Sequence, residues 1–521
     1  MSKQKIITGA LIILAASMIT RVLGFVFRIY ISNRLGAEGM GLYQLVLSLY
    51  MLLVAFATNG IAIAVSKMVA EQQEVNRYGG TRPILRMAVA YSLLISIATA
   101  IILFLFACPI GEFLLKDERT IISLRCLAPS LPFMAVSSCI KGYFYAMRDS
   151  FKPSSAQVIE QVAKMIFIVF IIGLWLPYGD AFACAATVLG MTVGEIVSCA
   201  YVVMTYYADR KKTTKTKGKQ RKIIKEFIHI SLPIQTSSTF HSLLRLAENL
   251  LIISGLRIFT GGDDSSAIGA YGILKGMVLP LLMFPTSLLQ ALVTTLIPEV
   301  ASANAGGKRE RIRRAVNKVL QLTLMMSVVI VLIFMLFPHQ IGNMLYHEPQ
   351  VGNMLALLCP ICPLMYLEMV TVGVLNAIGE QVAPMRYNIA DSIIRIILIY
   401  FFVPKGGIQA FLWIMIVSNL FTSLLNLRRL LKVTKVKFKW KNWIVFPSIA
   451  AAAAAFPAKI LYAFFFDGLF PVWFCVCLCS VIVVVLYIGL LFAMKCITPG
   501  ELHWVRDCFK RKKSDTHFKK A

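Results

Sequence analysis

The sequence predicts an all-α, polytopic membrane protein, and three observations lead to this fold class. Hydrophobic residues make up 58% of the 521 residues and charged residues only 15%, whereas soluble proteins contain about 25% charged residues. Apolar stretches long enough for membrane helices, which need about 20 residues, recur along the whole chain. Most of the 53 Lys and Arg residues fall in alternate gaps between these stretches. A soluble multidomain protein is therefore excluded.

Fourteen spans are expected from the apolar stretches. The first is expected to be a span rather than a cleavable signal peptide, because it is long and lacks a small-residue cleavage site. The expected spans cover residues 6–33, 40–70, 84–108, 120–146, 155–176, 182–207, 226–256, 270–300, 315–338, 352–378, 384–403, 408–432, 444–465 and 471–495.

The distribution of positive charge predicts the orientation. Basic residues concentrate in gaps such as 77–86, 210–225 and 308–318, whereas the intervening gaps hold only Arg34, Lys116, Arg119, Arg257 and Lys405. The positive-inside rule then places both termini of a multi-pass cell-membrane protein in the cytoplasm. In this context the net charge of +28 indicates anionic membrane lipids as partners rather than nucleic acid.

An internal repeat divides the expected spans into two six-helix halves. An offset of 228 aligns residues 41–43 with 269–271, and an offset of 231 aligns Pro129 with Pro360. Such parallel halves rock about a central site in transporters. The predicted organisation is an N-lobe at 1–208, a basic cytoplasmic linker at 209–225, a C-lobe at 226–432, a two-helix appendage at 433–495 and a basic cytoplasmic tail at 496–521.

Charged residues within the expected spans are the candidate functional residues, because a charge in a bilayer usually faces a bundle interior or a watery cavity. Arg21 and Arg28 are seven residues apart, on one face of an expected helix, 6–33, whose sequence contains no acidic residue. Arg245 and Glu248 are three apart on one later helix, and Lys275 stands alone on the next. We expect these five residues to bind an anionic headgroup between the halves, since guanidinium groups suit phosphate. Arg28 could instead snorkel to the outer interface.

Six further intramembrane charges admit two interpretations. They either couple transport to an ion or neutralise one another and hold helices together. They are the i,i+4 pairs Glu160/Lys164 and Asp391/Arg395 and the isolated residues Glu195 and Glu368.

Enzymatic chemistry is not expected. The sequence contains no P-loop pattern and no His/Glu zinc signature, so we expect no catalytic residue, no metal site and no cofactor. Most of the 12 cysteines lie inside the apolar stretches, where they act as small hydrophobic residues.

Three segments, Thr20–Phe25, Gly36–Tyr43 and Ala64–Glu71, resemble the stage V sporulation protein B group of the multidrug/oligosaccharidyl-lipid/polysaccharide (MOP) superfamily. This group is similar to MurJ-type lipid II flippases. The resemblance implies a V-shaped, two-lobed transporter that works by alternating access, with its last two helices forming a groove for a lipid tail. Arg21 matches the first-helix arginine of the family, whereas Phe27 takes the place of the second.

The leading hypothesis is a flippase for an undecaprenyl-diphosphate-linked cell-wall precursor similar to lipid II. The resemblance implies a polyprenyl-diphosphate-linked glycan as substrate, with spore cortex peptidoglycan as a destination. We expect a monomer that cooperates with cell-wall synthesis enzymes. The alternatives are a cation-coupled multidrug exporter of the MATE type, an exporter of another lipid-linked polysaccharide unit, and a non-transporting scaffold for cell-wall enzymes.

Overall fold

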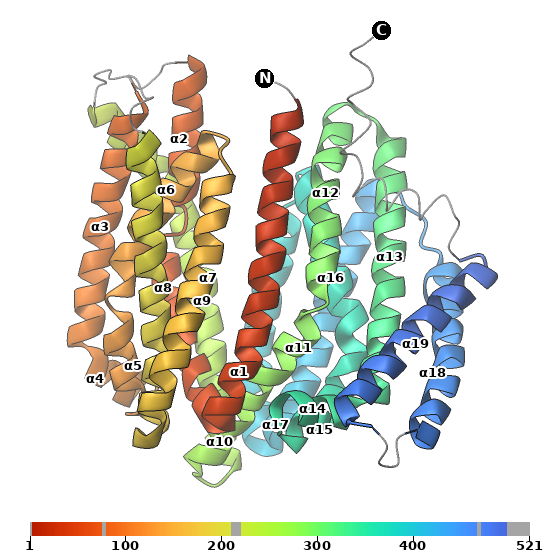
Figure 1. Cartoon of the computed structure of the whole chain (residues 1–521). Helices are drawn as coiled ribbons and strands as arrows, with labels where there is room; N and C mark the ends of the chain where they lie inside the picture. The colour runs from red at the N-terminus through yellow and green to blue at the C-terminus, as the bar shows by residue number, and fades with distance from the viewer. Residues whose placement is uncertain (1–2, 76–79, 210–219, 466–469, 497–521) are drawn as a thin grey trace. The chain divides into compact units, whose positions relative to one another are not determined.

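The computed structural model describes residues 3–75, 80–209, 220–465 and 470–496, whose regular structure is entirely helical (Figure 1). Within these ranges ten helical segments are long and apolar enough to cross a membrane. The number rises to eleven if α5 (Thr120–Leu127) and α6 (Ser130–Ala146), bent by 40°, form one span. The predicted class, an all-α multi-pass membrane protein, is confirmed. Helices suit this environment because every backbone polar group finds its partner within the segment.

Two compact units are defined by contacts within the chain. Unit 1 comprises Met1–Pro280 and Ser392–Phe411. Within it α7 and α8 pack along each other, α3 packs on α6, and α1 contacts α9 and α10. Besides α5 and α6, its helices are α1 (Lys3–Ala57), α2 (Ile61–Val75), α3 (Thr81–Leu105), α4 (Ala107–Pro109), η1 (Ile110–Leu114), α7 (Phe151–Trp175), η2 (Leu176–Tyr178), α8 (Asp180–Asp209), α9 (Gln220–Phe259), α10 (Asp264–Gly272) and η4 (Ile273–Val278).

Unit 2 comprises Leu281–Asp391 and Leu412–Ala521. The long helix α17 (Val382–Thr434) contributes to both units. The lobes predicted at 1–208 and 226–432 stay a prediction, and most of the predicted tail, 497–521, lies outside the described residues. The other helices are α11 (Leu279–Met283), which begins at the boundary, α12 (Thr286–Ala305), α13 (Arg309–Leu336), α14 (Pro338–Tyr346), α15 (Pro349–Leu358), η5 (Cys359–Ile361), α16 (Cys362–Ile378), η6 (Lys441–Val445), α18 (Phe446–Phe465) and α19 (Val472–Ala493).

Two helices are much longer than one membrane crossing. α1 has 55 residues and α17 has 53, and each contains one non-helical residue, Gly36 (φ 69°) and Gly407 (φ 58°) respectively. At 1.5 Å per residue each helix would extend about 80 Å if straight, more than twice the hydrocarbon thickness of about 30 Å. Glycine accepts these positive φ values because it has no Cβ. The chain therefore changes direction at these two glycines.

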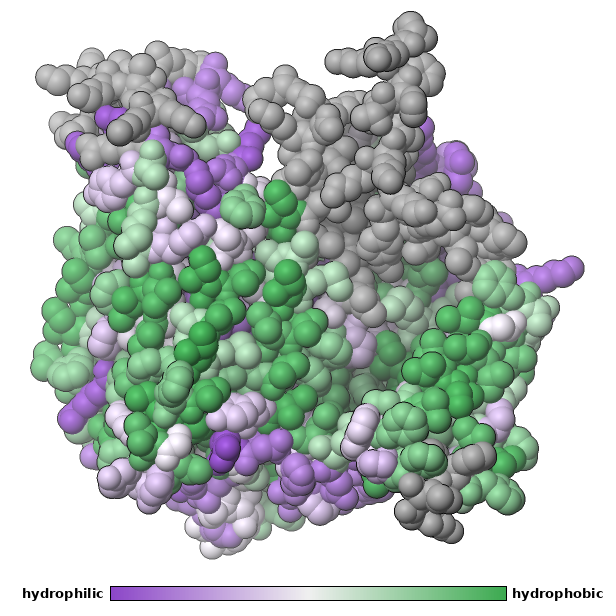
Figure 2. All heavy atoms as spheres, viewed as in Figure 1, coloured by the Kyte–Doolittle hydropathy of each residue, from purple (hydrophilic) through white to green (hydrophobic). Residues whose placement is uncertain are grey.

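Apolar packing forms the interior of each unit. In unit 1, Met68, Phe144 and Phe227 belong to one buried cluster that joins α2, α6 and α9. In unit 2, Ala454 and Tyr487 join α18 and α19 to α13, and the Tyr487 hydroxyl donates to the Met325 carbonyl at 2.9 Å. Figure 2 shows hydrophobic side chains across the middle of the visible face of unit 1 and hydrophilic ones at its ends, as a membrane requires.

Glycines allow α1 and α10 to approach at backbone distance. A Cβ added at Gly272 would lie 2.1 Å from the Ala37 carbonyl oxygen, and one added at Gly41 would lie 2.1 Å from the Ile268 carbonyl oxygen. Membrane helices use small residues in this way because association there depends on close packing.

We expect Gly272→Ala to destabilise the protein by about 1–3 kcal/mol, because the new methyl group must push the two backbones apart. The matched control is Gly173→Ala in α7, where an added Cβ meets nothing within 4 Å. That substitution should be neutral or stabilise by up to about 1 kcal/mol through helix propensity. The measurement is the apparent melting temperature in detergent, and equal melting temperatures for the two variants would contradict the close approach.

Candidate functional site

Glu248 on α9 lies at the centre of a buried charged cluster in unit 1. Its carboxylate is 3.3 Å from the Arg395 Nε of α17 and 3.9 Å from the Lys275 Nζ of η4. The Glu248 side chain is only 7% exposed, and the two cations are each 22% exposed. Three elements far apart in the sequence thus meet at one carboxylate.

Local backbone geometry positions Lys275. It lies in a π-helical segment, η4, which follows α10 directly, and such segments often mark functional sites. Its Nζ also lies 5.6 Å from the centroid of the buried Phe411 ring. A cation over an aromatic face is stabilised electrostatically, so the ammonium group is held between a ring and a carboxylate.

The Glu248 cluster has more positive than negative charge. Arg245 is exposed on the same helix as Glu248, and its charge acts on His241 together with those of Arg395 and Glu248. The Glu248 carboxylate thus contacts two permanent cations, and a third cation, Arg245, lies one turn away on the same helix. Such an arrangement favours an anionic ligand, because burying unbalanced charge is costly without a counter-charge.

The two arginines of α1 take different positions. Arg21 is exposed and Arg28 is half-buried. Arg28 lies near a second group of charges, since it contributes to the electrostatic environment of Lys164 on α7. The structure thus groups Arg28 with charges of the first six predicted spans, and Arg245, Glu248, Lys275 and Arg395 with one another.

The second charged group contains three bases, Arg28, Lys141 and Lys164, and two acids, Glu160 and Glu195. Glu160 on α7 pairs with Lys141 of α6 at 3.4 Å, and Lys164 lies within the electrostatic influence of Glu160 and Glu195. Sequence reasoning missed Lys141, because a partner 19 residues away on another helix leaves no periodic signal. The Oε2 atom of Glu195 on α8 is buried without a hydrogen-bond donor among the described residues.

The two remaining predicted acids lie in unit 2 and accept hydrogen bonds from hydroxyl groups. Asp391 accepts from Ser418 at 2.6 Å, and Glu368 on α16 accepts from Thr422 at 2.9 Å. Across the described residues no group of three or more His, Cys, Asp or Glu side chains could hold a metal ion.

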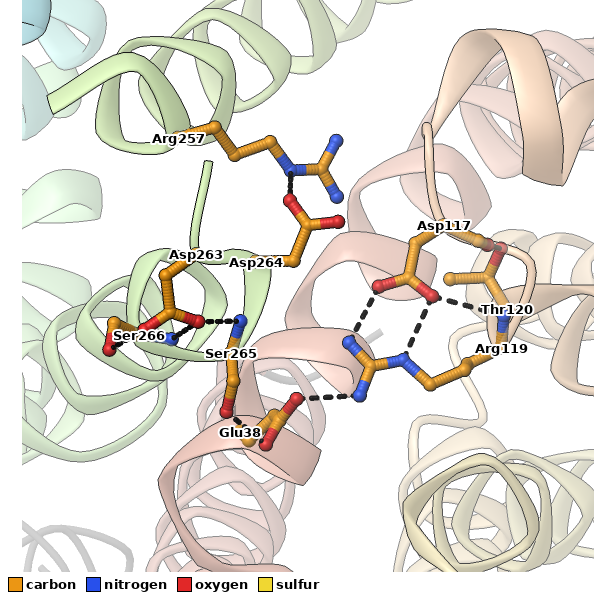
Figure 3. A network of polar contacts seen from close by, with 9 residues as sticks. All are labelled: Glu38, Asp117, Arg119, Thr120, Arg257, Asp263, Asp264, Ser265 and Ser266. Atoms are coloured by element: carbon orange, nitrogen blue, oxygen red, sulfur yellow. Dashed lines mark hydrogen bonds and ion pairs between the residues drawn. The ribbon is translucent and has the colours of Figure 1, made fainter. Parts of the chain in front are cut away.

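A polar network ties α1 to α5 and α10 within unit 1 (Figure 3). Arg119 binds both carboxylate oxygens of Asp117, at 3.0 and 2.9 Å, and contacts Glu38 at 2.5 Å. Glu38 also accepts from the Ser265 hydroxyl at 2.6 Å. We call Glu38, Asp117, Arg119 and Ser265 the Glu38 network. The sequence identified Arg119 only as a basic residue of a predicted outer loop.

Electrostatics reinforce the Glu38 network. The hydrogen bond from Arg119 to Asp117 raises the pKa of Arg119, so the guanidinium stays charged. At the start of α10, Asp263 caps the helix by accepting from the amides of Ser265 and Ser266. The hydrogen bond from the Ser266 hydroxyl lowers the pKa of Asp263, which keeps this cap ionised. The charged forms of Arg119, which binds Glu38 of α1, and of Asp263, which caps α10, are thus both favoured.

The helical fold and the charges inside it define a membrane transporter of the MOP superfamily. The family model of polysaccharide biosynthesis proteins matches residues 6–303, and the MatE model matches residues 246–401. The chain belongs to the polysaccharide biosynthesis protein family. Since these families comprise transporters, the expectation that the chain is not an enzyme is confirmed.

Individual relatives agree with this assignment. Stage V sporulation protein B of Bacillus subtilis (strain 168) is 27% identical over 452 residues, covering 85% of this chain and 87% of that protein. The lipid II flippase MurJ of the same strain is 24% identical over 426 residues, covering 76% and 77%. A solved structure of the lipid II flippase MurJ in an inward closed conformation matches 92% of this chain and 98% of its own chain, with a TM-score of 0.68 and 14% identity. The last comparison shows the fold.

We expect Glu248→Gln to destabilise the protein by about 3 kcal/mol, because Lys275 and Arg395 lose their buried counter-charge. Replacing Lys275 by Met in the same chain should recover part of the loss, since one unbalanced cation is removed. The measurement is the apparent melting temperature, with the exposed residue Glu310 changed to Gln as the control. If Glu248→Gln behaved like Glu310→Gln, the carboxylate would have no organising role.

Proposed function

We propose that the protein is a flippase that moves a diphosphate-linked cell-wall precursor, carried on a polyprenyl chain, across the cell membrane by alternating access. The observation that carries this proposal is the pair of cations, Lys275 and Arg395, that meet at the buried carboxylate of Glu248 in the interior of unit 1. A diphosphate is attracted to such a cluster of cations, and one arginine can bind two phosphate oxygens at once. Membership in the polysaccharide biosynthesis protein family and the relatives named above support a lipid-linked glycan.

The proposal includes fourteen membrane crossings. Each of the two long helices counts as two spans, because α1 and α17 change direction at Gly36 and Gly407. α5 and α6 together count as one span. The 40 residues of α9 are long enough to cross, and their modest hydropathy reflects the charges of the Glu248 cluster. Both termini are proposed to lie in the cytoplasm, following the positive-inside rule.

Arg21, Arg245, Lys275 and Arg395 are the proposed substrate-binding residues. Exposed arginines on membrane helices usually face water-filled space, and Arg21 and Arg245 are both exposed. Lys275 and Arg395 are held in place by Glu248. We assign Glu248 a positioning role, because a carboxylate cannot donate to a phosphate.

Alternating access requires a contact that opens and closes. The contact between α1 and α10, with the Glu38 network at its edge, joins helices from the two halves of the sequence repeat. Hydrogen bonds, close glycine packing and buried apolar side chains such as Met40 and Ile268 hold this end. We propose that the two helices separate when the substrate leaves to the outer side.

A multidrug exporter is the second candidate. The match of the MatE model to residues 246–401 and the buried carboxylate of Glu248 favour it. A cationic drug, however, requires a surplus of negative charge, which the Glu248 cluster lacks. Resistance to cationic drugs that wild type confers and Glu248→Gln abolishes would make this the better proposal.

Transport is tested in liposomes that contain the purified protein and a fluorescent undecaprenyl-diphosphate-linked sugar. We expect Arg21→Gln and Arg245→Gln each to slow appearance of the sugar on the opposite leaflet by about 10-fold or more, because a charged hydrogen bond contributes about 1.5–3 kcal/mol. The control is Arg386→Gln, which changes another exposed arginine of the chain. Absence of flipping by wild type, with correct reconstitution, would overturn the proposed substrate class.

The proposed movement is tested by a disulfide between α1 and α10. A Cβ at Gly269 lies 3.8 Å from the Ala37 Cβ, which is the usual spacing across a disulfide. The double variant Ala37→Cys/Gly269→Cys should lose transport under oxidation and regain it on reduction, whereas Ala37→Cys alone should respond to neither treatment. Undiminished transport by fully cross-linked protein would show that α1 and α10 need not separate.

A further inference from the structure

A basic pocket lies in unit 2 and shares no residue with the Glu248 cluster. Its volume is about 320 Å³, and it is formed where α13, η6 and the end of α19 meet. A hydrogen bond from the Gln321 side chain to the Cys496 carbonyl at 2.8 Å joins α13 to the segment after α19. The pocket is lined by Arg314, Asn317, Lys318, Gln321, Lys439, Asn442, Trp443, Lys495 and Cys496.

The lining combines positive charge with polar groups. Four of these residues are Lys or Arg, and none is Asp or Glu. Arg314, Lys439 and Lys495 are exposed, so their long side chains can reach a ligand from three separate segments. The Asn317 Oδ1 atom is buried without a donor among the described residues. A ligand that carries both an anionic phosphate and a hydroxyl donor would bind the basic side chains and donate to the Asn317 Oδ1 atom.

Aromatic residues beside the pocket resemble those found at a membrane surface. Phe438 packs edge-on against Trp440 and Trp443, with ring centroids 4.7 and 5.0 Å apart. Trp443 is buried in the pocket wall, whereas Trp440 is 64% exposed. Tryptophans concentrate at the depth of lipid headgroups. Exposed apolar side chains of η6 and α18, among them Val445 and Ile449, continue from this point and suit acyl chains.

We propose that this pocket binds the phosphoglycerol headgroup of an anionic membrane lipid. Arg314, Lys318, Lys439 and Lys495 would surround the phosphate, and Asn317 would accept from a glycerol hydroxyl. Basic pockets between membrane helices on the cytoplasmic side are known to hold anionic headgroups, and the predicted orientation puts this pocket on that side. The volume fits a headgroup, since pockets for larger ligands extend to about 1,000 Å³. The site does not depend on the transported substrate.

The experiment measures lipid binding to the full-length protein in detergent by native mass spectrometry. Phosphatidylglycerol is titrated against wild type, against Lys439→Gln/Lys495→Gln, and against the matched control Lys432→Gln/Lys437→Gln. The control removes the same charge from exposed lysines of the same region that do not line the pocket. At about 1 kcal/mol per lysine, we expect the pocket variant to bind the first lipid about 30-fold more weakly. The control should change this affinity less than threefold.

Two further competition measurements distinguish binding of a lipid headgroup from binding of a free phosphate ion. Phosphatidylcholine, which has no net charge, should not compete for the first site, and inorganic phosphate should displace phosphatidylglycerol only weakly. An equal loss in both double variants would overturn the pocket in favour of diffuse surface charge. Full displacement by inorganic phosphate would overturn the lipid assignment in favour of a free anion. If undecaprenyl phosphate bound tightly and phosphatidylglycerol did not, the pocket would be a site for the transported lipid and the proposal would be overturned.

Discussion

The need to satisfy every backbone polar group inside a membrane constrains the whole structure. Helices meet this need within each segment, and the described chain departs from regular α-helix at few places. Gly36 and Gly407 interrupt the two longest helices, and π-helical turns occur at η1, η4 and η6. Departures of this kind allow charged side chains such as Lys275 to be placed precisely, because the backbone between two helical stretches fixes their direction.

Glu248 shows how a buried carboxylate can organise a site for an anion. Removing one charge of a buried set leaves the others uncompensated, so the carboxylate keeps Lys275 and Arg395 close together although they repel each other. Its distances of 3.3 and 3.9 Å are longer than those of the tightest ion pairs. The cations are therefore held in position and retain capacity to bind phosphate oxygens.

The fold class and membrane character were predictable because they depend on hydropathy summed over long segments, and both are confirmed. Glu248, Lys275 and Arg395 could be identified from the sequence as candidate functional residues, since charged residues within apolar stretches are conspicuous. Their partners could not, because α9, η4 and α17 meet only through tertiary packing. The same limit explains why Lys141 and the Glu38 network were missed. The fourteen spans and the lobe boundaries stay predictions.

The repeat accounts for the contrast between the two charged groups. An offset of 231 relates Glu160 to Asp391 and Lys164 to Arg395, so both pairs descend from equivalent positions. Glu160 pairs with Lys141, and Glu195, Lys164 and Arg28 lie nearby. In the second half Asp391 accepts a hydrogen bond from Ser418, and Arg395 contacts Glu248 beside Lys275. Equivalent positions thus take different partners in the two halves, which suits a transporter whose two halves need not contribute equally to binding.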